Sequence, residues 1–241
     1  MIEYSDKKYH KKEVSSFSEL DLETQKILSW VEGSKSVLEF GCHTGRLSEW
    51  LQKKQCDVTG VEVNQYAIND ATPFLKKQIV GNIESDEVWV SIGSDTFDVI
   101  IFSHVLEHLA DPWSVLKKST EFLKNNGVII IALPNINNAQ DRFKILFGNF
   151  DYSEEGVMDK THLRFFNQKT SLELIEGAGL CVKEYFSPRK VNPIHYFFDH
   201  LPILWRIKKI IPLNKNRIFF RKNSNITDVV MMFICRKNDI L

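Results

Sequence analysis

The fold of this chain follows from one stretch, Val37-Leu38-Glu39-Phe40-Gly41-Cys42-His43-Thr44-Gly45. An apolar, strand-like run leads directly into two glycines spaced four apart, and a helix-like run over residues 46–54 follows at once. Glycine lets the backbone approach a ligand closely, and the start of a helix offers free backbone N–H groups. The stretch therefore predicts a strand, a glycine loop and a helix that together bind a nucleotide-like ligand.

A carboxylate follows at the distance that such a site requires. Glu62 lies twenty-one residues after Gly41, at the end of the next strand-like run, residues 56–63. An acid at that place can accept hydrogen bonds from both hydroxyls of a ribose. The loop departs from the dinucleotide fingerprint Gly-x-Gly-x-x-Gly, because His43 and Arg46 stand at the second and third glycine positions. A glycine-bearing turn in some other α/β domain is the alternative interpretation.

The order Glu-x-Gly-x-x-x-Gly resembles motif I of the class I S-adenosylmethionine-dependent methyltransferases, with His43 in place of the usual middle glycine. The resemblance implies S-adenosylmethionine as the cofactor. Asn82 stands near the point where the family often carries an acid, and it offers a carbonyl to the adenine amino group instead. The cofactor-binding residues that the resemblance implies are Glu39, Gly41, His43, Gly45, Glu62, Val63, Asn82, Ile83 and Ser103.

Strand-like and helix-like runs alternate along the chain, which predicts a parallel sheet covered by helices on both faces. We expect an α/β, Rossmann-like sheet of seven mostly parallel strands, and the resemblance implies an antiparallel last strand. The strands are expected at 36–40, 56–63, 77–80, 97–103, 128–133, 180–186 and 228–235. The helices are expected at 18–31, 44–55, 66–74, 111–123 and 168–176.

The composition is that of a globular protein of 241 residues, with 43% hydrophobic and 26% charged residues. We expect a single methyltransferase domain over residues 1–241, with a leading segment and helix at 1–35. The formal net charge of +0 implies no global attraction to nucleic acid, and none is expected as a partner. Scattered cysteines and the lack of an apolar signal core or spanning run favour a cytoplasmic protein.

The acceptor of the methyl group should lie beside the fourth and fifth strands, where His104-Val105-Leu106-Glu107-His108 follows the run 97–103. In a helical turn its three polar residues share one face. In some quinone O-methyltransferases the same place holds Glu-x-x-Glu-His and is associated with a divalent metal; here His104 replaces the first acid. An inverted zinc-protease signature is a further alternative. Our prediction assigns no metal and gives His108 as a candidate general base. Alternatively, Leu106-Glu107-His108 is a family signature in which His108 is a structural polar residue.

The segment 136–166 is long for a connection, and long insertions are often functional. It carries aromatic residues and a few cations, which suit a carbohydrate, an aromatic ring or a phosphate-bearing acceptor. His162 is the second candidate base; alternatively, His162 and Arg164 hold this segment to the body through Asp159 or Glu154. Residues 159–166 and the following helix resemble small-molecule methyltransferases similar to those of ubiquinone biosynthesis and of polysaccharide and glycolipid assembly.

A second insertion, residues 187–227, is basic and aromatic, with nine lysines and arginines against Asp199 alone. From 203 to 211 a helical period places isoleucines and a leucine on one face and Arg206, Lys208 and Lys209 on the other. Three interpretations of this segment are open: a cap over the domain, a contact with an anionic membrane at the inner membrane surface, or a dimer or partner contact. The aromatics are not spaced as a stacking platform for nucleic acid.

These patterns favour methyl transfer to a small-molecule acceptor, by O-methylation of a sugar, a lipid-linked intermediate or a quinone-like molecule. The alternatives are a protein or nucleic-acid methyltransferase and a non-catalytic module that keeps the fold. The sequence after the fourth strand reads Ser103-His104-Val105-Leu106, without the Asn-Pro-Pro-Tyr/Phe signature of amino-group methylases. The oligomeric state stays open.

Overall fold

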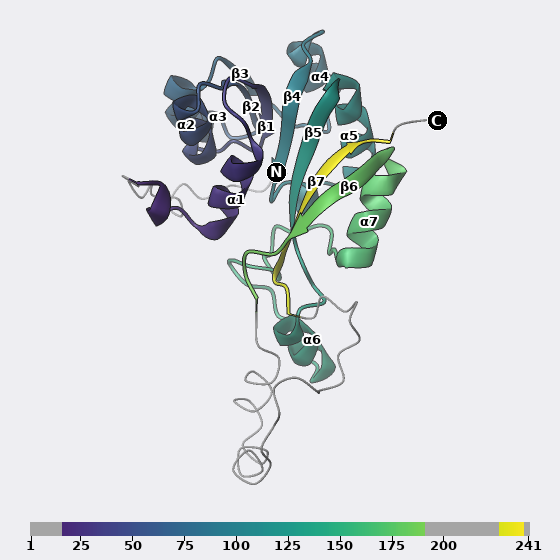
Figure 1. Ribbon diagram of the computed structural model, residues 1–241. Coiled ribbons are helices and arrows are strands. Elements are labelled where there is room, and N and C mark those ends of the chain that lie inside the picture. The colour runs from purple at the N-terminus through teal and green to yellow at the C-terminus, as the bar shows by residue number, and fades with distance from the viewer. Residues whose placement is uncertain (1–15, 191–226, 239–241) are drawn as a thin grey trace.

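The computed structural model describes residues 16–190 and 227–238. Its centre is a seven-stranded sheet of order β3-β2-β1-β4-β5-β7-β6 (Figure 1). β7 runs antiparallel to both of its neighbours, whereas the other pairs are parallel. The predicted α/β sheet with an antiparallel last strand is therefore confirmed. The strands are β1 (Ser36–Phe40), β2 (Asp57–Glu62), β3 (Lys77–Val80), β4 (Phe97–Ser103), β5 (Leu123–Pro134), β6 (Leu180–Phe186) and β7 (Val230–Lys237).

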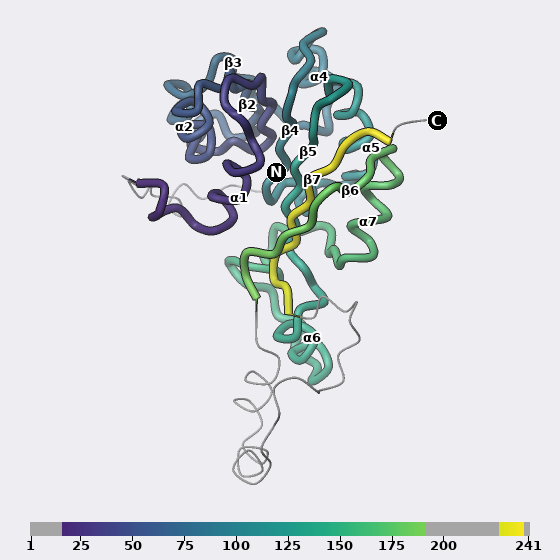
Figure 2. The backbone as a smooth tube through the Cα atoms, viewed as in Figure 1, coloured from purple at the N-terminus to yellow at the C-terminus, as the bar shows by residue number. Residues whose placement is uncertain are grey.

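Helices cover both faces of the sheet. Figures 1 and 2 show α1, α2 and α3 on one side and α4, α5 and α7 on the other. The first group is α1 (Leu22–Trp30), α2 (Arg46–Lys53) and α3 (Gln65–Ala71). The second is α4 (Asp86–Ile92), α5 (Pro112–Ser119) and α7 (Gln168–Gly177). The remaining helix, α6 (Ala139–Leu146), lies beyond the sheet, past the end of β5 (Figure 1).

The central strands are apolar on both faces because helices cover both. In β4, Ile100 and Phe102 belong to the cluster under α4, α5 and α7, whereas Val99 and Ile101 belong to the cluster under α1 and α2. Successive side chains of a strand point to opposite faces, so a strand buried on both reads as a continuous apolar run. This is why the sequence predicted β4 with its observed bounds.

Capping residues explain where the predicted helix bounds were wrong. The helix expected at 18–31 is a 3₁₀ turn, Phe17–Glu19, followed by α1, because the Asp21 side chain accepts from Thr24 N at 2.8 Å and starts the helix there. The helix expected at 111–123 ends at Ser119 in α5, and a 3₁₀ turn, Thr120–Phe122, leads into β5. β5 begins at Leu123, earlier than expected, because Leu123 already pairs with Phe97 of β4.

Two helices were not predicted at all. α4 has only seven residues, of which Val88, Trp89 and Ile92 are buried, and α6 lies inside the predicted insertion 136–166. Both are too short to show a clear helical period in the sequence. Among the described residues, none of the helices is long and apolar enough to cross a membrane. The basic stretch from 191 to 226 lies outside the described residues.

The strand order reverses between β1 and β4. The chain moves outward from β1 through β2 to β3 and then returns to place β4 on the other side of β1. In open α/β sheets a ligand binds at such a switch point, outside the carboxyl ends of the strands. The loops after β1, β2 and β4 therefore converge on one place.

One carboxyl group of β1 is buried away from that place. Glu39 is 5% exposed, and the Ser48 hydroxyl of α2 donates to its Oε2 at 2.6 Å. Burial raises the pKa of Glu39 from 4.5 to about 7, although the hydrogen bond from Ser48 lowers it. The folded protein therefore holds a proton on Glu39 that the unfolded chain releases at lower pH.

This linkage predicts how stability changes with pH. The contribution of Glu39 to stability is fully present below pH 4.5 and is lost as pH rises toward 7, by up to about 3 kcal/mol. Glu39→Gln removes this loss, because the amide does not ionise. Urea unfolding at pH 5 and pH 8 should show the wild type losing stability relative to Glu39→Gln at the higher pH. Parallel pH profiles would contradict the prediction, and Glu176→Gln, on the exposed side of α7, is the control.

Candidate functional site

A cavity of about 1150 Å³ opens at the switch point. Its first wall is formed by the ends of β1, β2 and β3, its second by the chain after β4, and its third by a loop of the 136–166 segment. The start of α1 lies over it, since Asp21, Leu22 and Glu23 also line the cavity. The lining of the first wall comprises Phe40, Gly41, His43, Val61, Glu62, Val63, Gly81, Asn82, Ile83 and Glu84.

The glycine loop takes a shape that few side chains would permit. Gly41 has φ +68°, and a Cβ there would lie 2.6 Å from Cγ2 of Val105. Gly45 has φ +78°, and a Cβ there would lie 2.8 Å from the Cα of Ala71. His43 also adopts a positive φ, +46°. The loop thus keeps a left-handed conformation at the position where the resembling family has its middle glycine, at the expense of some backbone strain.

Glu62 joins this loop to the loop after β2. Its Oε2 accepts from the backbone N–H of His43 at 3.0 Å, and its Oε1 accepts from that of Asn64 at 2.9 Å. The side chain is 8% exposed, yet it lines the cavity. A carboxylate offers about four lone-pair sites, so Glu62 keeps acceptor capacity for two hydroxyl groups. The arrangement fits the ribose of a nucleoside.

The other predicted cofactor residues divide into two groups. Val63, Asn82 and Ile83 line the cavity beside Glu62, and the Asn82 Oδ1 already accepts from Glu84 N at 3.0 Å. Glu39, Gly45 and Ser103 do not line it: Glu39 lies behind the loop, Gly45 caps α2, and the Ser103 hydroxyl donates to Glu23 at 3.1 Å. The contribution of Asp21, Leu22 and Glu23 was not predicted by residue, since no sequence pattern ties α1 to the switch point.

Two histidines face each other across the second and third walls. His108 ends the 3₁₀ turn Leu106–His108, and the ring of His162 lies 4.8 Å away, centroid to centroid, at an interplanar angle of 73°. The Nδ1 of His108 lies 3.2 Å from the carbonyl oxygen of Thr161, and that of His162 lies 3.0 Å from the carbonyl of Val157. Carbonyls only accept, so each Nδ1 donates, and in the neutral form of either ring the lone pair lies on Nε2. Burial lowers the pKa of His162, which favours this neutral form.

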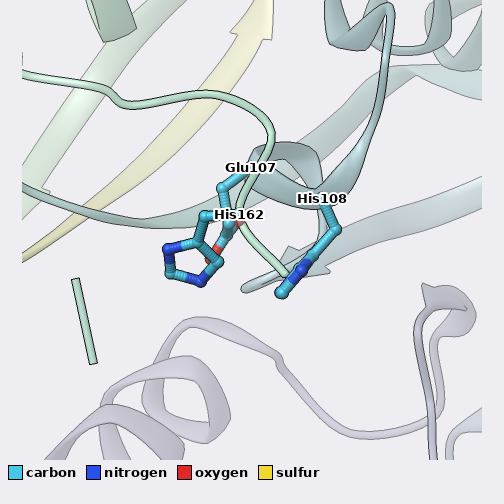
Figure 3. A group of neighbouring side chains, drawn as sticks. All are labelled: Glu107, His108 and His162. Atoms are coloured by element: carbon cyan, nitrogen blue, oxygen red, sulfur yellow. The ribbon is translucent and has the colours of Figure 1, made fainter. Parts of the chain in front are cut away.

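Beside the histidines lies a carboxylate that is completely buried. The Oε1 of Glu107 is bonded to Nδ1 of His104 at 3.2 Å, and its Oε2 has no hydrogen-bond partner among the described residues. Its backbone carbonyl accepts from both Leu163 N and Arg164 N, each at 2.9 Å, which fastens the loop to the turn. Figure 3 shows the side chains of Glu107, His108 and His162 directed to the same side of the turn. A buried carboxylate oxygen without a partner is costly unless a ligand satisfies it.

His104 carries a positive charge next to this cluster. Its Nε2 lies 2.8 Å from Glu23 of α1, and its backbone takes φ +55°. Burial opposes the charged ring, but the hydrogen bonds to Glu107 and Glu23 outweigh it and raise the pKa of His104 well above its ordinary value. Both ring nitrogens are therefore occupied as donors to carboxylates.

Arg164 holds the loop to the body, but not through the predicted partners. Its guanidinium donates to the Ala110 carbonyl and lies 5.6 Å from the centre of the Trp113 ring at the start of α5. Asp159 instead accepts from the backbone and hydroxyl of Thr161, and Glu154 pairs with Lys160. The contacts of Arg164 with Ala110 and Trp113 support the alternative in which this residue holds the segment to the body, and His162 N donates to the Asp159 carbonyl at 3.0 Å.

A nucleoside pocket at the switch point of a 3-2-1-4-5-7-6 sheet, with a catalytic-type cluster across from it, defines a class I S-adenosylmethionine-dependent methyltransferase. A family model described as "Methyltransferase domain" matches residues 13–185. The chain belongs to this family, which confirms the resemblance drawn from the sequence. S-adenosylmethionine is therefore its cofactor, and the left-handed loop and the spare acceptor capacity of Glu62 fit that ligand.

Known relatives are distant. The chain is 26% identical over 184 residues to a ubiquinone biosynthesis O-methyltransferase of Acinetobacter baylyi, covering 70% of this chain and 76% of that protein. It is 24% identical over 171 residues to the same enzyme of Azoarcus sp., covering 64% and 72%. A SAM-dependent methyltransferase from Archaeoglobus fulgidus has a similar structure, with a TM-score of 0.62, 19% identity and coverage of 92% and 95%. A TehB-like methyltransferase from Corynebacterium glutamicum gives a TM-score of 0.55 at 18% identity, covering 92% and 91%.

One alternative interpretation of the sequence was a divalent metal bound by His104, Glu107 and His108. The structure changes that ligand set. Both nitrogens of His104 are engaged with carboxylates, whereas one ligand atom each of Glu107, His108 and His162 lies within 4.8 Å of the other two. A partnerless carboxylate oxygen and two imidazoles with free Nε2 atoms fit a divalent ion. His162 was predicted as a catalytic residue but not as a member of a metal cluster.

The role of Glu62 predicts the effect of its removal. Glu62→Ala removes two charge-assisted hydrogen bonds to the ribose, each worth about 1.5–3 kcal/mol at most, and frees the N–H groups of His43 and Asn64. Titration calorimetry should show S-adenosylmethionine binding at least about tenfold more weakly. Glu62→Gln, which keeps the size of the side chain, should have an affinity between those of the wild type and Glu62→Ala. Glu176→Ala on α7 should bind the cofactor like the wild type. An unchanged affinity in Glu62→Ala would contradict the cofactor site.

Proposed function

We propose that this enzyme transfers the methyl group of S-adenosylmethionine to an oxygen atom of a small-molecule acceptor, with a sugar, a lipid-linked intermediate or a quinone-like molecule as the acceptor class. The observation that carries the proposal is the pair His108 and His162, which lines the same cavity as Glu62. The names of the relatives, ubiquinone biosynthesis O-methyltransferases, support oxygen as the methylated atom.

Methyl transfer from a sulfonium is an in-line displacement, so the acceptor oxygen has to lie behind the methyl carbon. Holding the two reactants in that geometry can supply about 7–11 kcal/mol of the barrier. Glu62 and the loop from Gly41 to Gly45 hold the donor on one side of the cavity. The acceptor then binds between the donor and the histidine pair.

The acceptor hydroxyl has to lose its proton during the transfer. An imidazole with a free Nε2 lone pair can accept it, and a positioned base typically contributes about 10²–10⁴-fold to the rate. His108 and His162 both present such a nitrogen, fixed by a backbone carbonyl at Nδ1. A divalent metal bound to the same nitrogens would lower the pKa of the acceptor hydroxyl instead.

The rest of the acceptor side supports a hydroxyl-rich acceptor. Glu154, Glu155, Asp159, Lys160 and Arg189 line the cavity there. Carboxylates accept hydrogen bonds from hydroxyl groups, and cations neutralise a phosphate that accompanies many activated sugars. The aromatic residues expected to hold the acceptor, Phe143, Phe147, Phe150 and Tyr152, are not among the lining residues. Among the proposed acceptor classes, a lining of charged residues without these aromatic residues favours a sugar-bearing acceptor over a flat aromatic ring.

Replacement of the histidines tests the catalytic assignment. His108→Gln and His162→Gln should each lower the turnover of labelled S-adenosylmethionine with a hydroxyl-bearing acceptor by about 10²-fold or more, with cofactor affinity nearly unchanged. Lys169→Gln, exposed on α7, is the control. Full activity in both histidine variants would refute the assignment. Cofactor binding by the wild type with no transfer to any acceptor of the three classes would favour a non-catalytic module.

We also propose that the protein lies in the cytoplasm and contacts an anionic membrane peripherally. Exposed apolar side chains gather at the end of α6 and in the loop after it, namely Leu146, Phe147, Phe150 and Tyr152. The basic aromatic insertion 187–227 leaves and rejoins the described chain near the base of α6, where Asn135 Nδ2 donates to the Asp228 carbonyl at 2.7 Å and Val229 N to that of Arg189 at 2.9 Å. Apolar side chains next to many cations are typical of a membrane-surface contact.

Sedimentation with vesicles tests this contact. The protein should pellet with vesicles rich in anionic lipid at low salt and be released at high salt, because each cation near the surface contributes about 1 kcal/mol that salt screens. Replacing Arg206, Lys208 and Lys209 by Gln should reduce pelleting without changing cofactor affinity. The matched control replaces Lys53 of α2, Lys76 before β3 and Lys124 of β5. Wild type that stays in the supernatant at low salt would contradict the proposal.

A further inference from the structure

The cluster of Glu107, His108 and His162 offers two nitrogen atoms and one oxygen atom. The tautomers follow from the carbonyls that accept from each Nδ1, so both Nε2 atoms are the ligand atoms. Hydrogen bonding of the second ring nitrogen to a backbone carbonyl is the usual way in which a protein orients a metal-binding histidine. The oxygen is the Oε2 of Glu107, which is buried and has no partner among the described residues.

The cluster offers one carboxylate oxygen and two imidazole nitrogens as donor atoms. His104 is not one of the donors, because its ring lies between Glu23 and Glu107, with 2.8 Å and 3.2 Å between the paired atoms. Mg²⁺ prefers an octahedral shell of carboxylates, carbonyls and waters, whereas imidazole nitrogens suit zinc, iron, nickel and copper. The donor atoms of the cluster therefore disfavour Mg²⁺.

We propose that Glu107, His108 and His162 form a three-ligand centre that binds Zn²⁺, or a similar transition-metal ion, in preference to Mg²⁺. Three protein ligands of this kind leave a position open to the cavity, as in catalytic zinc sites. The inference goes beyond the proposed methyl transfer, because the ion and its selectivity are measured without cofactor or acceptor.

The geometry requires only a local adjustment. Zinc–ligand distances of about 2.0–2.1 Å place tetrahedral ligands roughly 3.3 Å apart. One potential ligand atom from each of Glu107, His108 and His162 already lies within 4.8 Å of the other two. The loop that carries His162 is fastened to the Glu107 carbonyl through Leu163 and Arg164, so the backbone positions are set. Rotations of the three side chains can close the remaining gap. A bound ion would then cross-link the end of β4 to the loop and stabilise the folded protein.

Cobalt provides a direct probe, because the visible absorption of Co²⁺ is much stronger in a tetrahedral or five-coordinate site than in the hexahydrated ion. The full-length protein, freed of metal by a chelator, is titrated with Co²⁺ alone. We expect one equivalent to develop these bands, Zn²⁺ to remove them at about equimolar concentration, and Mg²⁺ to leave them at an excess of about 100-fold or more. Zn²⁺ should also raise the melting temperature, whereas Mg²⁺ at the same concentration should not.

Variants distinguish the ligand set. His162→Gln should abolish the bands, or weaken Co²⁺ binding by at least about 100-fold, whereas His104→Gln should keep them because His104 is not a ligand. Circular dichroism checks that both variants are folded. Bands that persist in His162→Gln but vanish in His104→Gln would overturn the ligand assignment. Spectra of hexahydrated Co²⁺ throughout, or displacement by equimolar Mg²⁺, would overturn the proposal and leave methyl transfer standing. Zinc binding without methyl transfer would overturn the proposed function alone.

Discussion

The carboxylate of Glu62 is the contact on which the shape of the loops after β1 and β2 depends. It accepts from the backbone N–H of His43 after β1 and from that of Asn64 after β2, so one buried side chain fixes two loops. The fixed loop keeps three left-handed residues, Gly41, His43 and Gly45, around the nucleoside position. A carboxylate can hold these N–H groups and still accept ribose hydroxyls, because it has lone pairs on both oxygens. Structure and ligand binding thus share one group.

A second carboxylate, Glu107, organises the acceptor side in a similar way. Its carbonyl holds the loop of His162, one carboxylate oxygen contacts the His104 ring, and the other oxygen is buried without a hydrogen-bond partner among the described residues. His104 extends the network to Glu23, so α1 is joined to the end of β4 over the cavity. The two walls are therefore built on two buried acids, one in the wall proposed for the donor and one in the wall proposed for the acceptor. The switch point of the sheet brings them to the same cavity.

The sequence predicted the features that depend on local pattern. β1, β3, β4 and β6 have the expected bounds, because buried strands appear as apolar runs ended by turns. Glu62 was predicted as a cofactor residue from its spacing to Gly41, and it lines the cavity. The cluster could not be assembled from the sequence, because His162 is brought to His108 by two hydrogen bonds to the Glu107 carbonyl across more than fifty residues. For the same reason the sequence could not show that His104 contacts Glu23, because this is a tertiary contact with α1.

The central claim is that the cofactor held by Glu62 and the histidine pair meet in one cavity. A crystal structure of the full-length protein with S-adenosylhomocysteine tests it most directly, since that product occupies the place of the donor. The account predicts both ribose hydroxyls on the carboxylate of Glu62 and the sulfur directed toward the space between His108 and His162. A ribose bound away from Glu62, or a sulfur directed away from the histidine pair, would contradict it.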